Sequence, residues 1–161
     1  MSNEDQQTNS NAVTPQTLGA TASSGAKVLE PEAARAFAIS AAQSLQDDKC
    51  TDVVVIDVSG ISPVTGFIVI GSGTSARQMR SALEDVDDLA KDLGTQAYAI
   101  SADDRALWLL ADFVDVVVHL FEPNARAHYD LESLWSKGTR VQVPPSERSR
   151  AHGGGDSGSD A

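Results

Sequence analysis

Three short runs of β-branched and aromatic residues constrain the fold of this chain most strongly. They lie within residues 52–58, 67–70 and 115–121. Within the runs, apolar side chains follow one another instead of alternating with polar ones, as they would in a strand with one solvated face. Each run is therefore expected to form a strand buried on both faces, and helices must cover the sheet that these strands build.

Helical spacing of apolar residues predicts those helices. It extends from Pro31 to about residue 48, and from residue 76 to 93, where Gly94 should end the helix. A last helix is predicted over 125–136, further strands over 96–101 and 107–111, and a short closing strand at 141–143. The predicted fold class is α/β, with a mixed sheet of about five strands covered by helices.

Both ends of the chain differ from the middle in composition. Residues 1–29 and 144–161 are rich in small and polar residues and hold few large apolar side chains. Such segments cannot offset the entropy lost on ordering, so they are expected to be disordered tails. A single domain is predicted over residues 30–143.

The charge balance favours a protein partner. The chain has 12 basic and 23 acidic residues, a net charge of -11, and the ends carry little of it. An acidic domain repels phosphate backbones and anionic lipids, so binding to DNA or membranes is not expected, whereas a basic protein is a natural complement. The same acidity would also simply keep the chain soluble. A lone Cys50 and the absence of a signal-like start predict a cytoplasmic location.

No pattern for catalysis or metal binding is present. The histidines lie far apart, and no cysteine pair or His-Glu-x-x-His spacing occurs. Asp57, Asp112 and Asp115 lie on or beside predicted strands, where metal-dependent enzymes often hold their acids, but nothing in their spacing brings them together. We predict no catalytic residue, no metal and no cofactor.

One loop is a candidate anion-binding site. Ser72, Gly73, Thr74 and Ser75 connect a strand to a helix, where backbone N–H groups can meet an anion. No Gly-Lys-Ser/Thr follows, so the loop is not a P-loop, and its glycines also suit a plain tight turn. It keeps open the alternative of a nucleotide-binding or nucleotidyltransferase-type enzyme.

An aromatic and acidic segment is the strongest candidate for partner binding. Its members are Trp108, Leu109, Leu110, Asp112 and Phe113, with Asp115 beside them. Tryptophan often anchors interfaces but also fills cores. Alternation along a strand places Trp108 and Leu110 on one face and Leu109 on the other, so one of these sets must belong to the core.

Several separated motifs, in order, resemble the ribosomal silencing factor family, also called Iojap-like. The first half contributes Asp57-Val58, Thr65-Gly66-Phe67-Ile68-Val69-Ile70 and Ser72-Gly73-Thr74-Ser75. The second half contributes Trp108-Leu109-Leu110-Ala111-Asp112-Phe113, Asp115-Val116-Val117-Val118-His119-Leu120-Phe121 and Tyr129-Asp130-Leu131-Glu132. The resemblance covers residues 32–143.

The resemblance implies a fold related to nucleotidyltransferases, without known catalytic activity. It also implies a partner, the large-subunit ribosomal protein numbered fourteen, and a function: blocking the small subunit from joining and so repressing translation. Homodimers of the free protein occur in the family. The chain departs from the family at Gly66, where Asp is usual, and at Ala102 and Val114, where Gly is usual, so a different backbone is expected near Val114.

Overall fold

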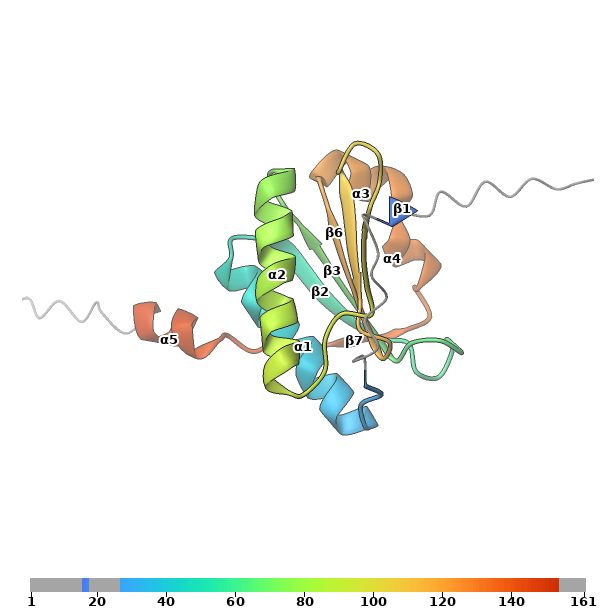
Figure 1. Ribbon diagram of the computed structural model, residues 1–161, viewed down its shortest axis with the longest axis vertical. Helices are drawn as coiled ribbons and strands as arrows, with labels where there is room; N and C mark the ends of the chain where they lie inside the picture. Colours follow the sequence, from blue (N-terminus) through green and yellow to red (C-terminus); the bar gives the residue numbers. More distant parts are fainter. Residues whose placement is uncertain (1–15, 18–26, 154–161) are drawn as a thin grey trace, which may run out of the picture.

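The structure is a computed structural model that describes residues 16–17 and 27–153, and one mixed sheet organises these residues (Figure 1). The strand order is β1-β4-β5-β6-β3-β2-β7. The parallel neighbours are β3 and β6, and every other pair is antiparallel. The strands are β1 Gln16–Thr17, β2 Thr51–Asp57, β3 Phe67–Ser72, β4 Ala99–Ala102, β5 Trp108–Asp112, β6 Val116–Phe121 and β7 Thr139–Val141.

Helices cover both faces of this sheet, so the predicted α/β class is confirmed. They are α1 Pro31–Asp47, α2 Ala76–Asp92, α3 Pro123–Tyr129, α4 Leu131–Leu134 and α5 Glu147–Gly153. The sheet has more strands than predicted because β1 extends one edge, whereas β7 at the other edge corresponds to the closing strand predicted at 141–143. None of the helices in the described residues has both the length and the apolar character needed to cross a bilayer.

The two faces of the sheet are covered unequally. The long helices α1 and α2 lie across one face, the α1–α2 face, and enclose the larger core, which includes Phe37, Leu45, Met79, Leu83, Leu109, Phe113 and Leu120. The shorter α3 and α4 lie on the other face, the α3–α4 face, above a smaller cluster of Ile56, Val58, Ile68, Ile70, Trp108, Phe121 and Ala125. A pair of short helices leaves part of this second face uncovered.

The prediction of one helix over 125–136 is wrong, because the chain turns sharply at Asp130. This residue has a φ of 48°, in the left-handed region, which aspartate tolerates better than most side chains. Its carboxylate accepts a hydrogen bond from the Ser133 hydroxyl at 2.6 Å. The turn separates α3 from α4 and lets each helix follow the sheet.

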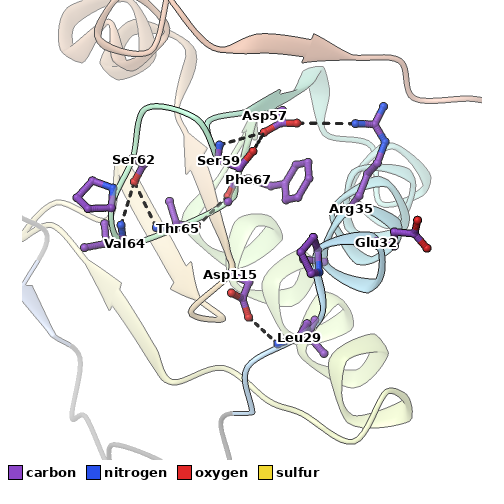
Figure 2. Close-up of a pocket in the computed structure, with 14 residues that line it drawn as sticks. Leu29, Glu32, Arg35, Asp57, Ser59, Ser62, Val64, Thr65, Phe67 and Asp115 are labelled. Carbon is purple, nitrogen blue, oxygen red and sulfur yellow. Dashed lines mark hydrogen bonds and ion pairs between the residues drawn. The ribbon is translucent and has the colours of Figure 1, made fainter.

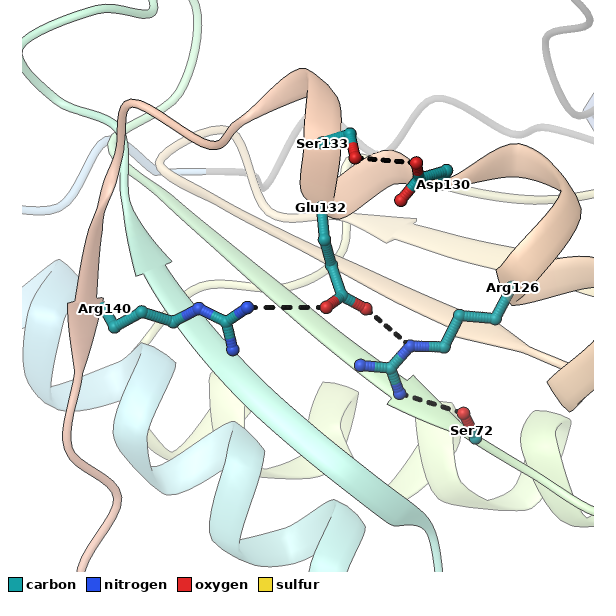
Figure 3. A network of polar contacts seen from close by, with 6 residues as sticks. All are labelled: Ser72, Arg126, Asp130, Glu132, Ser133 and Arg140. Atoms are coloured by element: carbon teal, nitrogen blue, oxygen red, sulfur yellow. Dashed lines mark hydrogen bonds and ion pairs between the residues drawn. The ribbon is translucent and has the colours of Figure 1, made fainter.

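A polar network fastens α3 and α4 to the strands (Figure 3). Arg126 of α3 donates through Nε to Glu132 of α4 at 2.7 Å, and through Nη1 to the Ser72 hydroxyl of β3 at 2.9 Å. Arg140 of β7 reaches the other Glu132 oxygen at 3.4 Å. These charge-assisted bonds fix where the α3–α4 pair ends and where the sheet is left open.

Two described segments within the predicted tails have secondary structure. They are β1, which pairs with β4, and α5. The segment before α5 is held to α1, because Gln43 donates to the Pro144 carbonyl at 2.8 Å and the Ser146 hydroxyl donates to Asp47 at 2.8 Å. Such polar contacts leave no apolar pattern in the sequence. Residues 1–15, 18–26 and 154–161 of the predicted tails lie outside the described residues.

Candidate partner-binding surface

The structure separates the predicted contact residues into buried and half-exposed groups. Leu109 and Phe113 are fully buried on the α1–α2 face, and Phe113 packs edge-on against Phe37 with ring centroids 5.1 Å apart. Trp108, on the α3–α4 face, is only 9% exposed. Leu110 and Asp112 share that face with Trp108 but are half-buried. Of the predicted contact residues in β5, only Leu110 and Asp112 are therefore accessible to a partner.

Helix α3 covers one end of β5 and leaves the other end open. The Tyr129 ring lies 4.8 Å from Trp108 and 6.0 Å from Phe121, so it covers this pair. Beyond it, Leu110 pairs with His119 of β6 and with Ser101 of β4, and Asp112 pairs with Val117. We call these five residues the β4–β6 patch: Ser101, Leu110, Asp112, Val117 and His119.

The patch is apolar in its middle and carries one carboxylate. Leu110, Val117 and Asp112 are half-buried, whereas Ser101 and His119 show 8% and 7% of their surface. Since cross-strand neighbours on one face lie close enough for their side chains to touch, these residues form one continuous surface.

A hydrogen bond from Trp108 fixes the state of His119. The indole Nε1–H donates to His119 Nδ1 at 3.1 Å. Indole nitrogen is a donor only, so Nδ1 must accept. Burial lowers the pKa of His119 to about 3, so the ring is neutral at pH 7 and its proton lies on Nε2. Trp108, buried beside the patch on the same face of the sheet, thus orients a histidine within it.

The Asp112 carboxylate is held by the turn that follows β5. Its Oδ1 accepts the Val114 N–H at 2.8 Å. Val114 has a φ of 72°, in the left-handed region that favours glycine. The turn therefore has a glycine-like backbone despite its branched residue, and it aims an N–H group at the carboxylate.

Asp115 lies away from the patch, in a hollow of about 450 Å³ beside the start of α1 (Figure 2). Its carboxylate accepts the Leu29 N–H at 2.7 Å. Asp57, across the hollow, accepts from Ser59, and this bonding lowers the pKa of Asp57. The structure does not bring Asp112 and Asp115 onto one surface.

The candidate anion-binding loop uses most of its hydrogen-bonding groups within the chain. Ser72 belongs to β3 and accepts from Arg126, and the Gly73 N–H donates to the Phe121 carbonyl. The Thr74 N–H donates to the Gln78 side chain, and Ser75 caps α2 by accepting the Gln78 N–H. A Cβ at Gly73 would lie 2.3 Å from the Met79 side chain, so close packing against Met79 already favours glycine here. Anion binding here stays an untested prediction.

Comparison with known proteins identifies the family. A family profile described as "Ribosomal silencing factor during starvation" matches residues 31–159. The chain belongs to the ribosomal silencing factor family. The Bacillus subtilis ribosomal silencing factor is 36% identical over 95 residues, which cover 59% of this chain and 80% of that protein.

Two further proteins are similar to this member of the family, one in sequence and one in fold. The mouse protein named mitochondrial assembly of ribosomal large subunit protein 1 is 34% identical over 57% of this chain and 42% of its own length. A crystal structure of a Chromobacterium violaceum protein superimposes with a TM-score of 0.59 at 28% identity, covering 73% of this chain and 95% of that one. The family likeness is therefore one of both sequence and fold.

Sequence reasoning did not single out three residues of the β4–β6 patch: Ser101, Val117 and His119. A lone histidine on a predicted strand is usually a hydrogen-bonded packing or surface residue, so the sequence alone does not single out His119 for partner binding. The described residues contain no cluster of acids, histidines or cysteines that could hold a metal ion. Alternation along β6 places residues 117, 119 and 121 on one face, which was a usable signal. The pairing of β6 with β5, which brings His119 beside Leu110, cannot be obtained from alternation.

The buried His119 predicts a loss of stability in mild acid. Its pKa falls from about 6.5 in the unfolded chain to about 3 in the fold, so the unfolded state binds more protons as the pH drops from 6.5 towards 3. We expect the free energy of unfolding to decrease by up to about 1.4 kcal/mol per pH unit across this window. Urea unfolding of the wild type and of His119→Asn at pH 7, 5.5 and 4 would measure it.

Asp48 works in the opposite direction. Burial and the neighbouring Asp85 raise its pKa to about 6, so protonation of Asp48 below pH 6 favours the folded state. Because Asp48 is partly exposed, screening should limit this gain to about 1 kcal/mol. His119→Asn removes only the histidine contribution, so its stability should fall less between pH 6.5 and 4. Equal losses in both proteins would contradict the assignment.

Proposed function

We propose that this chain binds the large ribosomal subunit through the β4–β6 patch and prevents the small subunit from joining, which represses translation. The proposed partner is the large-subunit ribosomal protein numbered fourteen. Membership in the silencing factor family supports the ribosome as target. The main support for this site is the part of the α3–α4 face that the helices leave open. There the apolar Leu110 lies next to the Asp112 carboxylate, which the turn holds in place.

The chemistry of the patch suits a basic ribosomal protein. Leu110 and Val117 offer apolar contact area, and Asp112 can pair with a lysine or arginine once water is excluded. The net charge of -11 would speed the encounter with a positively charged partner. Leu109 and Phe113 on the opposite face, and Trp108 buried beside the patch, would act indirectly by holding β5 in place. Asp115 would contribute only to a partner that also reaches the hollow beside α1.

We further propose that the protein acts by binding and not by catalysis, in the cytoplasm and without a cofactor, and that the free protein forms homodimers. The Ser72–Ser75 loop uses most of its hydrogen-bonding groups within the chain. This favours a binding protein over a nucleotide-binding or nucleotidyltransferase-type enzyme. Calorimetry with nucleoside triphosphates and Mg²⁺ distinguishes the two, since heat uptake at micromolar concentrations would favour the enzyme.

A subunit-joining assay tests the proposed function directly. Purified small and large subunits are mixed at a Mg²⁺ concentration that permits pairing, with increasing amounts of the protein, and the paired fraction is followed by light scattering. We expect the paired fraction to fall as the large subunits become occupied. Undiminished pairing at saturating protein would refute the proposal.

A further inference from the structure

His119 has one hydrogen-bonding group that the fold does not use. Nδ1 accepts from Trp108, and within the described residues Nε2 has no partner. Asp48 Oδ2 is the one fully enclosed side-chain atom without a partner in that part of the chain, so Nε2 is not sealed off from the surface. A partner that displaces water from Nε2 must supply an acceptor, because a buried N–H group without one is costly.

We infer that His119 Nε2–H donates a hydrogen bond to a neutral carbonyl oxygen of the partner that docks on the β4–β6 patch. This rests on the proposed function and adds a specific polar contact to it. His119 lies on the adjacent strand beside Leu110, the central residue of the patch. An acceptor arriving over Leu110 would therefore meet Nε2 in a site from which water is being displaced, where a hydrogen bond is strongest.

The electrostatics of the patch select the kind of acceptor. Asp112 shares the face and lies two residues from Leu110, so a partner carboxylate would meet an existing negative charge. Lysine and arginine side chains have no acceptor to offer. A main-chain carbonyl, or the amide carbonyl of asparagine or glutamine, fits both conditions. Such a group next to a basic side chain would satisfy His119 and Asp112 together.

Trp108 acts as a positioning residue for this contact, because it orients the His119 ring. By donating to Nδ1, it fixes the tautomer with the proton on Nε2 and holds the ring nearly parallel to Phe121, at an interplanar angle of 8°. A histidine free to choose its tautomer would spend part of its time without a donor at Nε2. The indole therefore affects the partner without reaching it.

Two substitutions separate the functions of the two ring nitrogens. His119→Asn keeps an acceptor near the Nδ1 position for Trp108 but has no donor at the Nε2 position, whereas His119→Gln places its amide near Nε2. We expect His119→Asn to weaken binding to purified large subunits about tenfold or more, and His119→Gln to remain within about threefold of wild type. Binding is measured by co-sedimentation over a range of protein concentrations, with His128→Asn on the exposed part of α3 as the matched control.

The outcomes distinguish this inference from the proposed function. If the wild type binds and His119→Asn binds equally well, the hydrogen bond is refuted while the proposed function stands. If the wild type does not bind large subunits, the proposed function fails and this inference fails with it. Nitrogen NMR of the imidazole in the free wild-type protein is independent of any variant's folding. A proton on Nε2 at pH 7 supports the inference, and a proton on Nδ1 overturns it.

Discussion

Asp112→Lys is expected to weaken binding to isolated large ribosomal subunits by roughly 30-fold or more, because it replaces an attractive charge with a repulsive one at the proposed contact. Loss of one partner of a desolvated charge pair typically costs about 2–5 kcal/mol. Co-sedimentation with purified large subunits measures the change. Unaltered binding would remove Asp112 from the interface.

Two variants separate the charge of Asp112 from its structural contact. Asp112→Asn keeps an oxygen that can accept the Val114 N–H but removes the charge, so it should weaken binding less than the lysine variant while preserving the turn. Glu84→Lys makes the same change of charge at an exposed position of α2, on the opposite face of the sheet, and should bind nearly as wild type. Thermal unfolding of all three variants checks that each domain is intact.

Trp108→Ala is expected to reduce the free energy of unfolding by about 3–5 kcal/mol, as large-to-small changes at buried aromatic residues do. The indole packs against both Phe121 and Tyr129 and donates to His119, so the variant leaves both a cavity and an unpaired imidazole nitrogen. For a domain of this size, the melting temperature should fall by about 10 °C or more. Calorimetric or circular-dichroism melting measures it.

Leu134→Ala is the matched control for this loss. Leu134 lies in α4 on the same side of the sheet but is 72% exposed, so its truncation should change stability by no more than about 0.5 kcal/mol. Similar melting temperatures for Trp108→Ala and the wild type would mean that the indole is not part of the core, and that it is free to meet a partner directly.

The elements that sequence predicted well are those whose burial leaves a signal in composition. β3 is buried along its whole length, β6 is buried over most of its length, and β2 is buried or half-buried from Val53 onward, which favours the apolar runs seen in the sequence. α2 was predicted almost to the residue, because Ser75 caps its start and Gly94, with a φ of 78°, follows its end. Local chemistry determines these features, so local sequence reveals them.

The patch could be predicted only in part, because it depends on pairing and coverage. Alternation separates Leu109 from Leu110, yet it does not say which face has a free area. That depends on the turn at Asp130, which sets how far α3 and α4 extend over the sheet, and on the Arg126 network that holds them there. A left-handed residue in an otherwise helical segment does not alter apolar spacing, so the break was missed.

The bond between Asp112 and Val114 bears on how quickly and tightly a partner can be captured. Left-handed backbone at a branched residue costs on the order of 1–2 kcal/mol, which the fold sustains at this turn. The hydrogen bond to Val114 holds the carboxylate in one orientation in the free protein. Binding a partner therefore loses less side-chain entropy, and ordering one such side chain costs about 0.5–1.5 kcal/mol. An Asp112 carboxylate that folding has already ordered would therefore increase the affinity for the partner.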